Sequence, residues 1–350
     1  MTSDYTSYVE LQEQIYTAKH LFGEELKKNL NLIPVECPLI IRVGTGIQDD
    51  LSGVEKSVKV DIANIPESTF EVVHSLAKWK RQKLSDYKFP VGKGIVSNMK
   101  ALRVGEVLDN VHSFVVDQWD WERVIKHEDR NLSFLKNIVE SIYEALRSTE
   151  SKLSEIYSHL TPVLPPKITF LHTEQLLGKY PKLSPKERER EATKEFGAVF
   201  LVGIGAKLSH GESHDARAPD YDDWSSPISS DEAVAHFPDL HMSANACVSF
   251  PGLNGDILVH NPVLDDAFEL SSMGIRVDPE TLCAQLEETG DTARMELPWH
   301  KDLIARNLPQ TIGGGIGQSR VAMFLLRKKH IGEVHCSFWP KEAYSQYALL

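Results

Sequence analysis

The feature that most limits the possible folds is a glycine-rich segment near the end of the chain, TIGGGIGQSRVAMFLL at 311–326. Glycine-rich segments that lead into a helix often bind phosphate, because bare backbone and free N–H groups approach an anion closely. Two familiar designs are excluded: no lysine follows Gly317, as a P-loop requires, and Gln318 replaces the third glycine of the dinucleotide fingerprint. We interpret the segment as a strand followed by a helix that begins near Arg320. Close packing between this strand and helix explains the glycines equally well.

The order of the predicted elements favours an α+β fold. Apolar spacing predicts a helix over 11–30 and a long surface helix over 128–156, and two more helices run from Pro185 to Gly197 and from Pro279 to Gly290. Strands are expected at 31–43, where prolines indicate an edge or interface strand, and at 57–62, 70–76, 112–124, 198–205, 255–264, 267–277 and 311–317. Helices do not alternate regularly with strands, and a hairpin is present. The pattern therefore predicts α+β, a mostly antiparallel sheet flanked by helices.

Charge and composition limit the partners and the compartment. The net charge of -12 argues against broad nucleic-acid binding, which usually shows a basic field. The most apolar run, 198–205, is too short to cross a membrane, and the first residues do not form a signal peptide. The four cysteines are scattered and form no C-x-x-C pair, so neither a zinc site nor a disulfide framework is indicated. We expect a cytoplasmic protein that binds neither nucleic acid nor membrane.

The strand predicted over 112–124 carries the first candidate site. Side chains alternate along a strand, so Gln118 and Asp120 share one face while Trp119 and Trp121 pack behind. Arg103 precedes the loop that leads into this strand. A strand with its polar face in water is the simpler interpretation, and it remains open.

The predicted hairpin carries a second candidate site. Alternation along 267–277 places Glu269, Ser271 and Met273 on one face, with Arg276 close by. A carboxylate and a guanidinium on one sheet surface can handle magnesium and an anion. A surface ion pair, worth about 0–1 kcal/mol, is the alternative.

Taken together, Arg103, Glu269 and Arg320 resemble the ATP-binding plan of class II aminoacyl-tRNA synthetases. In that plan the first arginine holds the α-phosphate, the acidic residue holds magnesium, and the last arginine contacts a bent ATP. The stretch LIPVECPLI at 32–40 resembles the proline-containing dimer motif of the same class. The resemblance therefore implies a class II synthetase-like core and a homodimer.

A closer resemblance is to the ammonia-dependent asparagine synthetases, also called aspartate–ammonia ligases, which share that core. It covers about residues 5–340 and rests on stretches such as QDDLSGVEK, VDQWDWERV, RAPDYDDW, AFELSSMGIRVD and PQTIGGGIGQSR. Residues 225–252 depart from it, since bacterial members are shorter there, and we expect a surface insertion within one catalytic domain over 1–350.

The resemblance implies both the reaction and its site. Aspartate, ATP and ammonia would give asparagine, AMP and pyrophosphate through β-aspartyl-AMP, with Mg²⁺ as cofactor. Asp49 is our preferred acceptor of the proton from ammonium, and the acid that binds the ammonium group of aspartate stays open. The implied catalytic residues are Asp49, Lys80, Arg103 and Arg320. Those implied to bind aspartate are Asp49, Lys80, Gln118, Asp120, Asp222, Ser272 and Arg276. Those implied to bind ATP are Arg103, Ser113, Tyr221, Ser271, Gly315, Gly317 and Arg320, and those implied to bind magnesium are Asp256 and Glu269.

Two alternatives of other kinds remain. A tRNA synthetase of the same core would normally carry an anticodon-binding domain and a basic surface for tRNA. A non-catalytic protein that binds aspartate or asparagine could lose its phosphate-binding arginines, yet Arg103 and Arg320 are both present. The nitrogen source is expected to be free ammonia, because position 2 is Thr2 and no cysteine lies in a recognisable Cys-His nucleophile signature.

Overall fold

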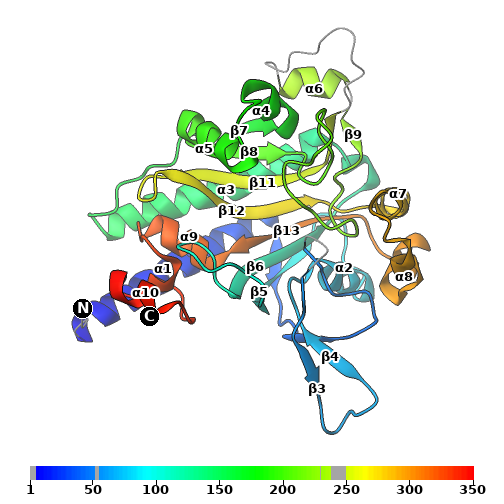
Figure 1. The fold of residues 1–350 in the computed structure, drawn as a ribbon, viewed down its shortest axis with the longest axis horizontal. Helices are drawn as coiled ribbons and strands as arrows, with labels where there is room; N and C mark the ends of the chain where they lie inside the picture. The colour runs from blue at the N-terminus through cyan, green and yellow to red at the C-terminus, as the bar shows by residue number, and fades with distance from the viewer. Residues whose placement is uncertain (1–4, 52–54, 229, 238–249) are drawn as a thin grey trace.

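The computed structural model describes residues 5–51, 55–228, 230–237 and 250–350. Within them, eight strands form a central sheet in the order β1-β5-β6-β13-β12-β11-β8-β7 (Figure 1). Neighbouring strands are antiparallel except for the edge pairs β1–β5 and β7–β8, which are parallel. This confirms the predicted α+β fold with a mostly antiparallel sheet. The strands are β1 Leu32–Pro34, β5 Gly94–Leu102, β6 Val115–Val124, β7 Thr169–His172, β8 Ala198–Val202, β11 Asn254–Asn261, β12 Asp266–Ile275 and β13 Thr311–Gly317.

Helices cover one face of this sheet fully and the other only at its ends. On the first face, α1 (Tyr5–Leu30), α3 (Leu132–Ile156) and α9 (Gln318–Leu325) pack with the strands into the largest core, which includes Trp119 and Trp121. On the second face, α2 (Ala77–Asp86) packs near β5 and β6, whereas α4 (Thr173–Lys179) and α5 (Pro185–Phe196) pack near β8 and β11 (Figure 1). The middle of the second face, over β6, β13 and β12, is left for the site.

The remaining elements lie around this core. β2 (Ile40–Arg42), β3 (Lys59–Asp61) and β4 (Thr69–Val72) form a separate three-stranded sheet. The prolines of the strand predicted at 31–43 split it, so that β1 joins the edge of the central sheet and β2 joins the small sheet. Further helices lie outside these layers: α7 (Pro279–Thr289), α8 (Pro298–Ile304) and α10 (Lys341–Gln346). Short 3₁₀ turns span His127–Asp129, Thr292–Glu296 and Ile331–Glu333. No described helix is both long enough and apolar enough to cross a membrane.

Capping residues set the ends of several helices as predicted. Ser184 and Glu187 form a capping box at α5, and Asp278 accepts from the N–H of Thr281 at the start of α7. α3 begins at Leu132 instead of 128, because Asn131 accepts from the N–H of Phe134 and so caps the helix there. This helix also buries one side in the core and is not simply a surface helix.

The expected insertion at 225–252 is anchored at its two ends. β9 (Pro227–Ile228) pairs antiparallel with β10 (Phe250–Pro251), and both Ile228 and Phe250 are buried. A short helix, α6 (Ser230–His236), follows β9, so part of the expected insertion is helical. Residues 229 and 238–249 lie outside the described part of the chain, and the surface position of the insertion stays a prediction, as does a single domain over 1–350.

The glycines of β13 make room for polar side chains of β6. Gly313, Gly315 and Gly317 pair with Glu122, Asp120 and Gln118, all on the uncovered face. A Cβ on Gly313 would lie 2.0 Å from Oε2 of Glu122, and one on Gly315 would lie 2.4 Å from Oε1 of Gln118. The side chains of Glu122 and Gln118 therefore cross over β13, which a larger residue at Gly313 or Gly315 would prevent.

We predict that Gly313→Ala lowers the free energy of unfolding by about 1–3 kcal/mol, the usual cost of overpacking, because the new methyl group collides with the buried Glu122 carboxylate. Gly105→Ala is the matched control, since a Cβ at that position would meet no atom within 4 Å beyond its own chain neighbours. Urea denaturation of both variants measures the difference. Equal stability of the two variants would contradict this explanation of the glycine-rich strand.

Candidate active site

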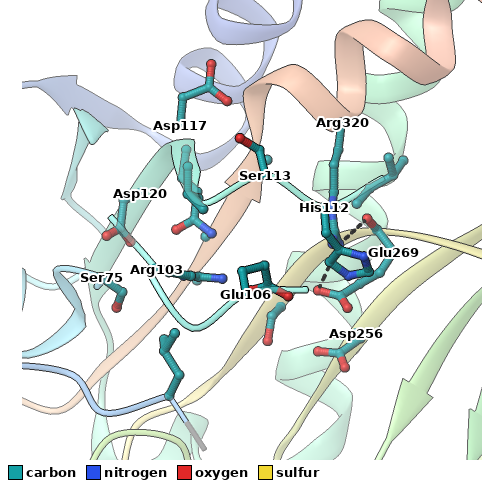
Figure 2. Close-up of a pocket in the computed structure, with 18 of the residues that line it drawn as sticks. Ser75, Arg103, Glu106, His112, Ser113, Asp117, Asp120, Asp256, Glu269 and Arg320 are labelled. Carbon is teal, nitrogen blue, oxygen red and sulfur yellow. Dashed lines mark hydrogen bonds and ion pairs between the residues drawn. The ribbon is translucent and has the colours of Figure 1, made fainter. Parts of the chain in front are cut away.

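A cavity of about 370 Å³ opens over the middle of the uncovered sheet face (Figure 2). Its size lies within the range of small-molecule sites, roughly 300–1,000 Å³. β6, β11, β12 and β13 contribute to its floor, and the segments before β6 and around 215–222 contribute to its walls. The sequence-predicted residues in its lining are Arg103, Ser113, Gln118, Asp120, Tyr221, Asp222, Asp256, Glu269, Ser272, Arg276, Gly315, Gly317 and Arg320.

Arg103 is a cation without a carboxylate partner in the part of the chain that the structure describes. Among the described residues its side chain makes one hydrogen bond, a 3.3 Å contact from a terminal nitrogen to the carbonyl oxygen of His74, and its buried Nε has no partner. Burial lowers the pKa of the guanidinium. Figure 2 shows Arg103 pointing into the pocket, with Asp120 on one side and Glu106 on the other. A partly buried guanidinium with unused N–H groups favours an anionic ligand at this point.

Asp120 is fixed by the start of α2. Its Oδ2 accepts from the backbone N–H of Leu76 at 2.9 Å, and its Oδ1 pairs with the ammonium group of Lys80. Lys80 also donates to the carbonyl oxygen of Trp121 at 2.8 Å. Buried charges need such partners, and the pairing holds the Asp120 carboxylate at the cavity wall.

Arg276 is held by two buried carboxylates. Nε and one terminal nitrogen contact Glu122 at 3.0 and 2.8 Å, and the other terminal nitrogen pairs with Asp222. Burial opposes the charge, but Glu122 and Asp222 raise the pKa of the guanidinium above its ordinary value. A guanidinium carries five N–H groups, and the contacts of its three nitrogens leave a further N–H on each terminal nitrogen for a ligand.

Two carboxylates and two arginines meet at the other side of the cavity. Arg217 donates to Oδ1 of Asp256 at 2.7 Å and also contacts Ser272. One terminal nitrogen of Arg320 lies 3.1 Å from the carbonyl oxygen of Glu269 and 3.7 Å from its carboxylate (Figure 2).

The pKa values of these two carboxyl groups move in opposite directions. Burial raises the pKa of Asp256 to about 6, and the nearby Glu269 adds to this although Arg217 opposes it. Burial also disfavours ionised Glu269, but Arg320, Lys186 and Arg217 together lower its pKa. Two carboxylates facing one cavity are a suitable start for a divalent cation, because Mg²⁺ commonly takes one or two carboxylates together with substrate phosphates. No group of three or more His, Cys, Asp or Glu residues that could hold a metal by itself occurs in the described ranges.

Three predicted site residues do not line the cavity. Asp49 is fully buried, and its Oδ2 accepts from Ser75 Oγ at 2.5 Å and from the N–H of Ala77 at 2.7 Å, so it lies behind two residues that do line it. Lys80 is likewise fully buried and lies behind Asp120. Burial raises the pKa of Asp49, although Lys78 opposes the rise.

Ser271 is the third, and a β-bulge explains its position. Ile257 pairs with Ser271 but Leu258 pairs with Glu269, so the register shifts by one residue in β12. Glu269 and Ser272 therefore line the cavity, whereas Ser271 borders a small apolar space against Phe22 of α1. The prediction that Glu269, Ser271 and Met273 share one face was wrong for this reason, and the side chain of Ser271 lies outside the lining of the cavity.

Sequence reasoning missed several charged residues that line the cavity or lie directly behind its lining, among them Glu122 and Arg217. Glu122 lies two residues beyond Asp120 on the same strand face, so strict alternation would have included it. Arg217 lies immediately before the acidic loop at 218–226, and only its contact with Asp256 across the cavity reveals its position.

The fold is similar to those of solved class II aminoacyl-tRNA synthetases. Asparaginyl-tRNA synthetase from Pyrococcus horikoshii, complexed with asparaginyl-adenylate, matches with a TM-score of 0.66 at 14% identity over 95% of this chain and 70% of that chain. The Entamoeba histolytica asparaginyl-tRNA synthetase in complex with asparaginyl-adenylate matches with a TM-score of 0.60 at 15% identity, over 93% of this chain and 66% of that chain. Aspartyl-tRNA synthetase from the same organism matches with a TM-score of 0.58 at 12% identity, over 95% of this chain and 62% of that chain. The chain thus spans about two thirds of the length of these synthetases, and at such low identity the likeness shows the fold alone.

Similarity over nearly the whole chain identifies the family. A family model described as aspartate-ammonia ligase matches residues 9–349. The match runs from α1 through β13 and α9, and so includes every strand that contributes to the cavity floor. The chain therefore belongs to the aspartate–ammonia ligase family.

Proposed function

We propose that the protein makes asparagine from L-aspartate, ATP and ammonia through β-aspartyl-AMP, releasing AMP and pyrophosphate. The observation that carries the proposal is Arg103, a partly buried guanidinium with no carboxylate partner in the described chain, which points into the cavity. The family match and the asparaginyl-adenylate held by two synthetases of similar fold support it.

The first step joins two anions, and the cavity supplies cations for them. The β-carboxylate of aspartate attacks the α-phosphorus, and pyrophosphate leaves. Repulsion between carboxylate and polyphosphate must be offset by fixed positive charge, which acts most strongly where water is excluded. Arg103 would hold the α-phosphate as charge builds on it. Arg320 would fix the nucleotide above Gly315 and Gly317, and Tyr221 and Ser113 also line the cavity.

Aspartate would lie at the end of the cavity near β6. The remaining N–H groups of Arg276 suit its α-carboxylate, and Asp120 and Asp222 suit its ammonium group. Gln118 and Ser272 offer neutral hydrogen bonds, and Lys80 would act through Asp120. The arrangement leaves the β-carboxylate to face Arg103.

Mg²⁺ would be held by Asp256 and Glu269 together with the phosphates of ATP. When bound there it neutralises phosphate charge. Because Arg217 already pairs with Asp256, this arginine would have to share that carboxylate or turn to the phosphates when ATP enters.

The second step needs free ammonia. Ammonia attacks the acyl carbon of β-aspartyl-AMP, AMP leaves, and the extra proton of the new amide must go to a base. Asp49 stays our candidate, since its Oδ1 is buried without a hydrogen-bond partner among the described residues and its Oδ2 contacts Ser75 at the cavity wall. The free thiols of Cys37, Cys283 and Cys336 suit a reducing, cytoplasmic setting, and the charge of -12 gives no support for a nucleic-acid partner.

We also propose a homodimer. β1 forms one edge of the central sheet, and Ile33 on it and Leu39 after it are 50% and 56% exposed. An open sheet edge with exposed apolar residues favours pairing with a second copy.

The first prediction from this proposal concerns the products. Pure protein with aspartate, ATP, Mg²⁺ and ammonium should form asparagine with AMP and pyrophosphate in equal amounts, and the rate should rise as pH rises toward the pKa of ammonium. Glutamine freed of ammonia should replace ammonium poorly. Formation of ADP and phosphate, or asparagine with an equal release of glutamate at a comparable rate, would defeat the proposal.

The second prediction concerns the two arginines. Arg103→Ala and Arg320→Ala should each slow aspartate-dependent ATP–pyrophosphate exchange by about 10²–10³-fold, because each removes a charged contact that strengthens in the transition state. Arg147→Ala is the matched control, because Arg147 is partly exposed on α3, lies outside the cavity lining and forms an ion pair only with Glu144 among the described residues. Exchange retained in either pocket variant would refute the role assigned to that arginine.

The third prediction concerns assembly. Light scattering at micromolar concentration should give twice the chain mass of 39.4 kDa, and Ile33→Asp should shift the protein toward monomer because it puts a charge into the interface. A wild-type protein that shows only the 39.4 kDa species would overturn the dimer.

A further inference from the structure

Four polar side chains form a cluster behind the nucleotide end of the cavity. They come from separate parts of the chain: Lys19 from α1, Asp117 from β6, Ser319 from α9 and His335 from the segment after it. Asp117, Ser319 and His335 are all buried and border the cavity, and Lys19 is partly buried. The proposed reaction gives none of them a task.

Asp117 contacts the first turn of α9 twice. Its Oδ1 accepts from the backbone N–H of Ser319 at 3.0 Å, and its Oδ2 accepts from Ser319 Oγ at 2.8 Å. The first N–H groups of a helix have no partner within the helix, and Gly317, which precedes α9, has no side chain to cap them. A carboxylate from the neighbouring strand therefore takes the place of the missing cap.

Lys19 keeps this carboxylate ionised. Its Nζ donates to Oδ2 of Asp117 at 2.8 Å, and although burial opposes ionisation, Lys19 and the other contacts hold the pKa of Asp117 at about 2. In Figure 2 Asp117 points away from Arg103, toward the helix that carries Lys19.

His335 contacts the same Ser319 hydroxyl, but among the described residues it makes no hydrogen bond to the backbone of α9. Its Nε2 lies 3.0 Å from the carbonyl oxygen of Val115, which can only accept, so Nε2 carries a proton. In the neutral ring Nδ1 then accepts, and the single Ser319 hydroxyl proton has two acceptors, Nδ1 and the Asp117 carboxylate. Only Asp117 also contacts the backbone N–H of Ser319, so Asp117 organises the cluster.

The next residue after Ser319 is Arg320. Within the described ranges its side chain makes one hydrogen bond, to the carbonyl oxygen of Glu269 at 3.1 Å, and so its direction depends on the turn that carries it. We propose that Asp117 is a positioning residue for Arg320, because its carboxylate fixes the first turn of α9 and thereby aims the guanidinium at the nucleotide. This rests on the proposed role of Arg320 in binding ATP.

The experiment compares KM for ATP, KM for aspartate and direct ATP binding by equilibrium dialysis in four variants. Asp117→Ala should raise KM for ATP about tenfold, equivalent to ~1.4 kcal/mol, and leave KM for aspartate within about twofold. Asp117→Asn should raise it less, about threefold, because the amide oxygen still accepts from the Ser319 N–H but has lost its charge. Ser319→Ala should have the smallest effect, because the backbone contact remains.

The fourth variant, Asp278→Ala, is the matched control. Asp278 caps α7 through the N–H of Thr281 in the same way but does not line the cavity, so its loss should lower the melting temperature and leave both KM values unchanged. A merely structural role of Asp117 would give the same result in Asp117→Ala.

The outcomes separate this inference from the proposed function. Equal rises in both KM values, or unchanged ATP binding in folded Asp117→Asn, would overturn the positioning role. Should Asp117→Ala not fold, Asp117→Asn and Ser319→Ala decide the question by the same split. A wild-type protein that binds ATP but forms no AMP would sink the proposed reaction, and the shift in ATP affinity would still test Asp117.

Discussion

The site depends on the burial of charged side chains against a strand that carries glycine at three positions on the uncovered sheet face. Glu122 of β6 lies over Gly313 of β13 and Gln118 lies over Gly315, with Asp120 between them on the same face of β6. Burying such groups is costly unless each is paired, and here Lys80 and Arg276 supply the partners. The glycines thus serve the packing of a charged network first, and the same strand forms part of the cavity floor.

Some charged side chains of the cavity are paired with opposite charges and others are not, and this difference indicates which kinds of ligand the cavity could bind. Around Arg276 the charges satisfy one another, which suits the fixed recognition of a small amino acid. Arg103 lacks a carboxylate partner in the described chain, while Asp256 and Glu269 face the cavity together. An anion and a divalent cation would complete both sets at once. The helices that cover only the ends of this sheet face leave the space in which they would meet.

Local rules of sequence predicted much of this arrangement. Period-two alternation separated Gln118 and Asp120 from Trp119 and Trp121, and capping residues located the starts of α5 and α7. The bulge that turns Ser271 away from the cavity left no signal, because it depends on how β12 pairs with β11. The positions of Asp49 and Lys80 behind the cavity wall could not be predicted either. They follow from contacts with Ser75, Ala77 and Asp120, and most of these contacts join residues far apart in the sequence. The roles of the residues that do line the cavity stay predictions.

The most direct test of adenylation follows the oxygen atoms of aspartate. With ¹⁸O in both oxygens of the β-carboxylate, attack on the α-phosphorus places one labelled oxygen in the phosphate of AMP, and the other stays in the amide of asparagine. Mass spectrometry of the products should therefore find one ¹⁸O per AMP and none in pyrophosphate. Label in inorganic phosphate, with ADP as the nucleotide product, would contradict the account.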